Sequence, residues 1–213
     1  RSHAEFVKKG IAFQPNLVIG HNPGSLSPTS SIAAALNIPC MFDAEDYHRG
    51  EQDANSMQSR QVTALEDRFI PHLSAMTAAS PMIGAAYSKL YPGTTITTVN
   101  NAFPKTKAQT SAQPGTGPLR MVWFSQVVGL DRGLEPFIKG MSMASDIPIE
   151  LTIIGQCTHD VKSELHDHII SPQHSIHFKE PMDEPNLFTY LSEFEIGLAL
   201  EVSVTENRRL CRT

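Results

Sequence analysis

The stretch Arg120-Met-Val-Trp-Phe-Ser-Gln-Val-Val-Gly-Leu-Asp-Arg-Gly133 joins a strand-like run to a helix-like run. The apolar run ends at Phe124, and a short polar loop leads to Arg132-Gly133, where the helix opens. In a parallel α/β sheet, backbone N–H groups and the positive end of a helix meet at such a junction and attract phosphate. An adjacent guanidinium adds a charge-assisted hydrogen bond. The residues that we expect to bind a diphosphate are Ser125, Gln126, Gly129 and Arg132, although an ordinary strand-to-helix loop with a surface arginine fits the spacing equally well.

The composition is that of a soluble globular protein and excludes several functional classes. The chain has 213 residues, of which 40% are hydrophobic and 18% charged, and its net charge is -5. A non-specific nucleic-acid binder needs a basic face, so nucleic acid is not an expected partner. No stretch of about 18 uninterrupted apolar residues is present, so no membrane-spanning helix is expected. Cys40, Cys157 and Cys211 are odd in number and far apart, which favours reduced thiols in a cytoplasmic protein.

Strand-like and helix-like runs alternate along the chain, which predicts an α/β fold with two Rossmann-like parallel-sheet lobes. We expect an amino-terminal lobe over residues 1–106, a linker over 107–118 that lacks large apolar residues, and a carboxyl-terminal lobe over 119–213. Each lobe has about four strands, fewer than the usual five or six, so both lobes are expected to be incomplete. The expected strands are 16–20, 38–42, 74–78, 94–99, 120–124, 150–154, 175–178 and 196–200. The expected helices are 27–37, 53–70, 81–90, 133–142, 159–169 and 184–192.

Several of these segments resemble the GT-B glycosyltransferases, and within them the retaining enzymes of family 4. Asn16–Pro23 resembles the strand that ends in a histidine loop, and Phe42–Glu51 resembles the next strand and loop in a bacterial branch of the family. Trp123–Gly133 resembles the phosphate loop of the second lobe, and Phe194–Glu201 resembles the strand before the family's donor carboxylate motif. The resemblance covers nearly the whole chain. It implies an internal fragment that spans parts of both lobes, with the paired-glutamate motif beyond Thr213.

This chain departs from the family's pattern at two places in the phosphate loop. Many members of the family have Gly-Arg where this chain has Ser125-Gln126, and a lysine where it has Arg132. Loss of one cation weakens diphosphate binding unless Arg132 compensates.

His21 and the acidic segment that follows residue 42 are the other candidate site residues. His21 comes directly after a buried strand, where ligands bind in parallel sheets, although a loop histidine bonded to backbone is the simpler interpretation of its position. The acidic segment is a solvated loop on spacing alone. The resemblance implies that His21 contacts the sugar near the reacting centre. It also implies that Glu45, Asp46 and His48 contact the acceptor, and that the donor phosphate acts as the base.

Three functions follow from these observations. The first is a glycosyltransferase that moves a sugar from a nucleotide-diphosphate donor to a glycan or glycolipid acceptor, with retention, in polysaccharide biosynthesis. It needs no cofactor or metal, and it is cytoplasmic, either free or peripherally at the inner face of the membrane. The second is a non-catalytic, two-lobed ligand-binding or interaction module with a truncated donor site. The third is a sugar-nucleotide epimerase. The histidines between 159 and 177 have no spacing that closes a metal site.

Overall fold

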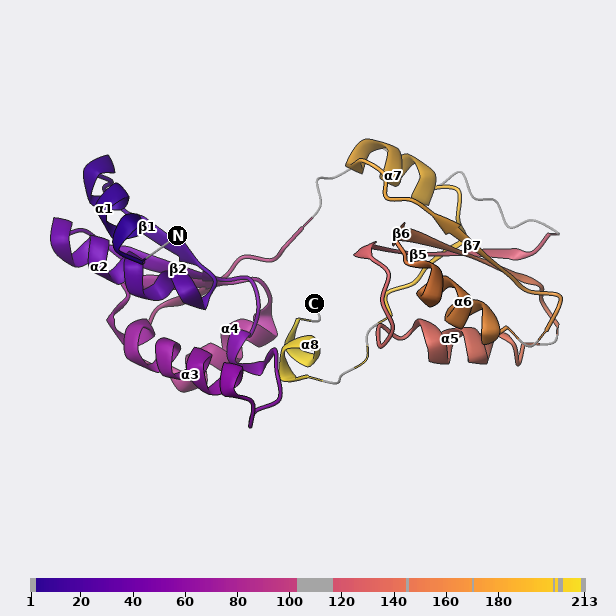
Figure 1. Ribbon diagram of the computed structural model, residues 1–213, viewed down its shortest axis with the longest axis horizontal. Helices are drawn as coiled ribbons and strands as arrows, with labels where there is room; N and C mark the ends of the chain where they lie inside the picture. Colours follow the sequence, from indigo (N-terminus) through magenta and orange to yellow (C-terminus); the bar gives the residue numbers. More distant parts are fainter. Residues whose placement is uncertain are drawn as a thin grey trace. The chain divides into compact units, whose positions relative to one another are not determined.

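The computed structural model describes residues 3–102, 117–144, 146–169, 171–200, 202 and 205–211. The chain divides into two compact units, which are 1–103 together with 203–213, and 104–202 (Figure 1). Almost all of the expected linker, 107–118, lies outside the described residues. We expected the second lobe to continue to Thr213, but the last helix, α8 (Glu206–Leu210), belongs to the first unit. None of the helices in the described residues is long and apolar enough to span a membrane.

The first unit contains a four-stranded parallel sheet with the order β1-β2-β3-β4. Its strands are β1 (Val18–His21), β2 (Cys40–Ala44), β3 (Ala75–Ala78) and β4 (Ile96–Thr98). Its helices are α1 (His3–Phe13), α2 (Leu26–Leu36), α3 (Met57–Phe69) and α4 (Pro81–Leu90), with short 3-10 turns η1 (Pro23–Ser25), η2 (His48–Gly50) and η3 (Ile70–His72). The expected alternation of strands and helices is therefore confirmed here.

The two faces of this sheet have different environments. Phe42, Ala44, Met76 and Ala78 are fully buried and pack with the helices into one core. Because successive side chains of a strand point to opposite faces, the residues between them lie on the other face. One of these is Asp43, whose neighbours in register on the adjoining strands are His21 and Thr77. The strand pattern alone therefore puts polar groups together at one end of the sheet.

The second unit also contains a four-stranded parallel sheet, with the order β7-β6-β5-β8. Its strands are β5 (Leu119–Val127), β6 (Ile149–Gln156), β7 (Ser175–Lys179) and β8 (Ile196–Gly197), and its helices are α5 (Leu134–Met141), α6 (His159–Asp167) and α7 (Glu184–Leu191). Helices α5 and α6 lie on one side of the sheet and α7 on the other (Figure 1). Both sheets are parallel and their strands alternate with helices along the chain, as expected for two Rossmann-like lobes.

The end of β5 differs from the prediction. We expected the strand to stop at Phe124, but it continues to Val127 with an irregularity in its pairing with β6. Gly155 explains this extension. It has φ 150°, and a Cβ atom there would lie 2.3 Å from the Ser125 carbonyl oxygen, so only glycine permits the two strands to approach so closely. Ser125 and Gln126 are therefore strand residues, and the loop proper begins after Val127.

Helix α8 is fixed to the first unit by side-chain hydrogen bonds. The Asn207 carboxamide accepts from the Tyr47 backbone N–H at 2.7 Å and donates to Asp46 at 3.0 Å. The Ser80 hydroxyl donates to the Leu210 carbonyl at 2.7 Å, and the Leu210 side chain joins the core. These contacts connect residues about 130 to 160 positions apart in the chain, so composition and periodicity do not reveal them.

Candidate functional site

The carboxyl end of the first sheet carries a compact group of polar side chains. His21 Nδ1 lies 3.1 Å from Asp43 Oδ2 and 3.9 Å from Glu45 Oε1. The Thr77 hydroxyl donates to the other Asp43 oxygen, Oδ1. The group lines a cavity of about 290 Å³ whose apolar surface includes Ile19 and Val99. Polar groups that converge in a partly apolar cavity at this edge of a parallel sheet are typical of a ligand site.

Asp43 determines which ring nitrogen of His21 is left to bind a ligand. When Nδ1 donates to the carboxylate, Nε2 becomes the acceptor nitrogen of the neutral ring. The hydrogen bond from Thr77 in turn holds the Asp43 carboxylate in place. About half of the His21 side chain is exposed, so the ring can reach a ligand in the cavity. His21 can therefore hydrogen-bond a hydroxyl group or take part in proton transfer.

The loop after His21 is tight and strained. Asn22 has φ 65° and ψ 147°, a conformation that costs residues other than glycine about 1–3 kcal/mol. Its carbonyl accepts a hydrogen bond of 2.7 Å from the Ser25 hydroxyl. A Cβ atom at Gly20 would lie 2.6 Å from that same hydroxyl oxygen. Gly20 and the strained Asn22 thus allow η1 to follow the strand at once, and they hold His21 at the edge of the sheet.

Of the three predicted acceptor residues, the structure brings only Glu45 to His21. Asp46 is bonded to Asn207 of α8. His48 is buried, its Nδ1 bonds Glu51, and its ring packs near Phe42. Sequence reasoning placed Asp43 in the acidic segment without a role, and it missed Thr77. The signal for Thr77 was available, since it occupies the same place in its strand as Asp43 does in β2.

The same group could also hold a cation. Ligand atoms of His21, Asp43 and Glu45 all lie within 4.8 Å of one another. One imidazole nitrogen and two carboxylate oxygens form a donor set suited to divalent zinc or manganese. No metal was predicted from the sequence, because His21 is far in the chain from Asp43 and Glu45 and meets them only where two neighbouring strands end.

The predicted phosphate residues lie at the carboxyl end of the second sheet, but not all in one loop. Ser125 and Gln126 are within β5, whereas Gly129 and Arg132 lie between β5 and α5. The Arg132 guanidinium carbon lies 5.9 Å from the centre of the Trp123 ring, which positions the cation by a cation–π contact. Its Nε is buried without a hydrogen-bond partner, and no carboxylate of the described residues forms an ion pair with it. Arg132 is thus available to an anionic ligand.

The backbone on either side of Arg132 forms a turn that could bind an anion, but a carboxylate competes for it. Asp131 has φ 60° and Gly133 has φ 86°, and positive-φ residues occur in the backbone turns that bind anions. The Asp131 N–H already donates to Glu135 Oε1 at 2.6 Å, and Glu135 Oε2 is buried without a partner. A phosphate would therefore have to displace this carboxylate or bind beside it, next to the Arg132 guanidinium.

Comparisons with known proteins identify the fold. No family model matches the chain, and a search of curated proteins finds no match. Among solved structures, a variant of TarM from S. aureus, in complex with fondaparinux, alpha-GlcNAc-glycerol and UDP, is similar with a TM-score of 0.69 at 13% identity. That match covers 92% of this chain and 39% of TarM.

Two further structures support the same assignment. The lipopolysaccharide outer core galactosyltransferase WaaB has a TM-score of 0.65 at 10% identity, covering 92% of this chain and 54% of its own. Anabaena HepE in complex with UDP has a TM-score of 0.62 at 15% identity, covering 87% and 53%. This chain therefore spans between about two fifths and a little over half of the length of these structures. The two parallel-sheet units have the fold of GT-B glycosyltransferases.

Proposed function

We propose that the protein transfers a sugar from a nucleotide-diphosphate donor to a hydroxyl group of a glycan or glycolipid acceptor. The observation that carries this proposal is Arg132, a cation held over Trp123 in a turn with positive φ at Asp131 and Gly133, without a carboxylate partner among the described residues. A guanidinium in this position matches the charge and geometry of a diphosphate. The shared fold, and the UDP bound in the TarM and HepE structures, support a nucleotide ligand.

His21 and Asp43 are proposed to act on the sugar or acceptor side. Asp43 orients the ring, so that His21 Nε2 faces the cavity and bonds a hydroxyl group there. Glu45 lies beside them and accepts a second hydroxyl hydrogen bond. We propose retention of the anomeric configuration, with the departing donor phosphate as the base, on the strength of the resemblance to the retaining enzymes of family 4. On this proposal the leaving diphosphate is neutralised by Arg132 and the backbone turn.

Binding is tested by calorimetric titration of the chain with UDP, GDP and ADP, and with their sugar conjugates. Loss of a charge-assisted hydrogen bond costs about 1.5–3 kcal/mol, so Arg132→Ala should weaken the best nucleotide about 10- to 100-fold. Lys139→Ala is the matched control, because it removes an exposed cation from the last turn of α5, the helix that follows Arg132. Unchanged affinity in Arg132→Ala would reject the donor assignment.

Stereochemistry is tested separately. The protein and the nucleotide sugar that it binds are incubated with oligosaccharide or glycolipid acceptors. The anomeric configuration of the product is then read by proton NMR. Product with the donor's configuration supports retention, whereas the opposite configuration contradicts the proposed base. Nucleotide binding without transfer to any acceptor would instead favour a ligand-binding module.

A further inference from the structure

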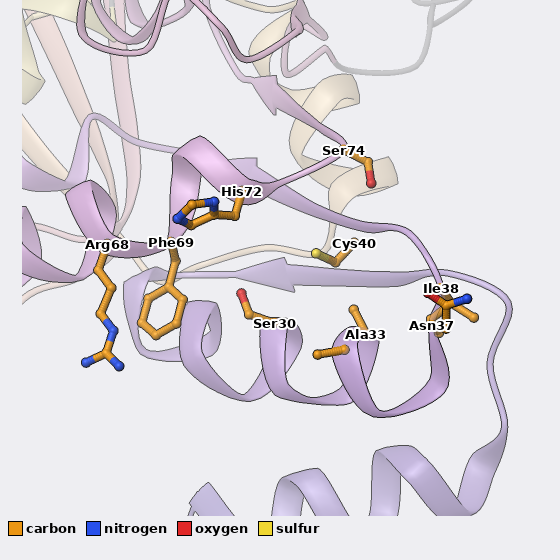
Figure 2. Close-up of a pocket in the computed structure, with 10 residues that line it drawn as sticks. Ser30, Ala33, Asn37, Ile38, Cys40, Arg68, Phe69, His72 and Ser74 are labelled. Carbon is orange, nitrogen blue, oxygen red and sulfur yellow. The ribbon is translucent and has the colours of Figure 1, made fainter.

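A second cavity lies at the opposite end of the first sheet from His21. Its volume is about 520 Å³, and it is lined by the carboxyl-terminal half of α2, the end of α3, η3 and the first residue of β2, Cys40 (Figure 2). Because Cys40 begins β2 and Asp43 lies near its end, this cavity is at the amino edge of the sheet. It is therefore separate from the site of the proposed sugar transfer, and it has no part in that proposal.

The charged lining of this cavity has one sign. Arg68 and His72 are the ionisable basic residues in it, and none of its lining residues is an aspartate or glutamate, although the whole chain has a net charge of -5. Arg68 forms no ion pair with the described residues, and its guanidinium carbon lies 5.3 Å from the centre of the Phe69 ring. Nearby Asp67 does not neutralise it, since that carboxylate pairs with Arg49. The lining therefore presents unneutralised positive charge.

An unsatisfied hydroxyl group is the second observation. Ser30 Oγ is buried and has no hydrogen-bond partner. Figure 2 shows this hydroxyl pointing away from α2 toward the side on which Phe69 and His72 lie. A buried hydroxyl without a partner is unfavourable, so a ligand oxygen that accepts its proton would remove that cost. Both features, the cation and the free donor, require an acceptor atom in the ligand.

The remaining lining is apolar. Ala33 and Ile38 lie along the α2 side of the cavity, and the Phe69 ring lies across from them (Figure 2). A cavity of this volume falls in the range of small-molecule sites and exceeds what a lone phosphate ion fills. Apolar walls together with a cation and a hydroxyl donor in the same lining indicate a ligand that carries both an oxyanion and a small apolar group.

We propose that this cavity binds a small organic oxyanion, a phosphate monoester or carboxylate attached to an apolar or aromatic group. Arg68 pairs with the oxyanion, Ser30 donates to it, and the apolar part packs on Phe69. The site is a second ligand site of the protein, at the edge of the sheet away from the sugar-transfer site.

The proposal is tested by calorimetric titration with phenyl phosphate, inorganic phosphate and benzyl alcohol. Phenyl phosphate should bind more tightly than phosphate because its ring is also buried, and benzyl alcohol should bind least because it has no charge. Phenyl phosphate that binds no better than phosphate would overturn the apolar part of the proposal. No binding of phenyl phosphate up to about 10 mM would overturn the site itself.

Variants locate the binding. Arg68→Gln and Ser30→Ala should each weaken phenyl phosphate about five- to tenfold. Arg60→Gln removes an exposed cation from the same helix as Arg68, and it should change the affinity for phenyl phosphate by less than about twofold. Ser30→Ala should also leave the melting temperature of the free protein unchanged or higher, because it removes a buried donor without a partner. Equal effects of Arg68→Gln and Arg60→Gln would show that phenyl phosphate does not bind in this cavity.

A final control separates this site from the nucleotide site. Arg132→Ala should bind phenyl phosphate as the unaltered chain does, while losing affinity for nucleotide diphosphates. Loss of both ligands in Arg132→Ala would show that phenyl phosphate occupies the nucleotide site, and it would overturn the second site while leaving the proposed transfer intact.

Discussion

Arg49 is expected to be the most sensitive charged residue of the first unit. Its Nε donates to Glu66 Oε2 at 2.6 Å, and its Nη2 donates to Asp67 Oδ1 at 2.6 Å. Glu66 is fully buried, and its other oxygen accepts from the Tyr87 hydroxyl at 2.8 Å. Replacement of Arg49 by methionine leaves this buried carboxylate without its counter-charge. The pair connects η2 with the last turn of α3, and the Tyr87 hydroxyl connects Glu66 with α4.

The loss of unfolding free energy expected in Arg49→Met can be bounded. A buried carboxylate that loses its partner escapes the full penalty by binding a proton, and burial already raises the pKa of Glu66 against the opposing effect of Arg49 and Tyr87. Protonation of a carboxyl group of usual pKa, about 4.3, at pH 7 costs about 3.7 kcal/mol, at about 1.36 kcal/mol per pH unit. This agrees with the roughly 3–5 kcal/mol observed when one partner of a buried pair is removed. Arg49→Met should therefore lose about 3–4 kcal/mol of unfolding free energy at pH 7.

The pH dependence distinguishes this explanation from a simple packing defect. In Arg49→Met the pKa of Glu66 is raised further, so the neutral form is present at low pH at no cost. The difference from the unaltered protein should then shrink to about 1 kcal/mol near pH 4.5. Arg49→Met combined with Glu66→Gln should recover most of the loss at pH 7, since no buried charge remains.

Urea unfolding followed by near-UV circular dichroism measures these differences, because three of the four tyrosines lie in the described part of the first unit. The single tryptophan, Trp123, lies in the second unit, and its fluorescence transition should not move. Arg60→Met is the control, with an expected change within about 0.5 kcal/mol. A loss below about 1 kcal/mol at pH 7, or a loss that does not vary with pH, would refute the reasoning.

Three further predictions follow from the geometry. Gly155→Ala should destabilise the second unit by about 2 kcal/mol or more, because its Cβ atom meets the Ser125 carbonyl, whereas Gly140→Ala in α5, with open space around it, should stabilise by about 0.5–1 kcal/mol. Trp123 fluorescence in urea measures both, and equal effects would contradict the steric explanation. The Tyr91 hydroxyl lowers the pKa of Asp67, so Asp67→Asn should be less stable than the unaltered protein above about pH 4, and the two should converge as the pH falls through the lowered pKa. Acid titration followed by circular dichroism tests this, and a gap that widens toward low pH would have the wrong sign. His21→Ala should lower the rate of sugar transfer about 100-fold or more with an unchanged urea midpoint, and His159→Ala, at a fully exposed position, should change neither. An equal loss of rate in both variants would remove His21 from the reacting centre.

The sequence by itself determined the elements and their class. Short β-branched or apolar runs such as 150–154 are typical of strands in a parallel sheet covered by helices, so their alternation with helical runs predicts the α/β fold. The position of His21 directly after a strand also predicts the edge of the sheet at which it lies. These inferences use only local periodicity and the ends of elements.

Only the tertiary structure decided which polar groups meet. The register of β1, β2 and β3 puts Asp43 and Thr77 beside His21, and it leaves Asp46 to bond with Asn207. The extension of β5 depends on Gly155 in a different strand. Strand register and close backbone approach are fixed by hydrogen bonds and packing between distant residues, and a linear pattern does not contain that information.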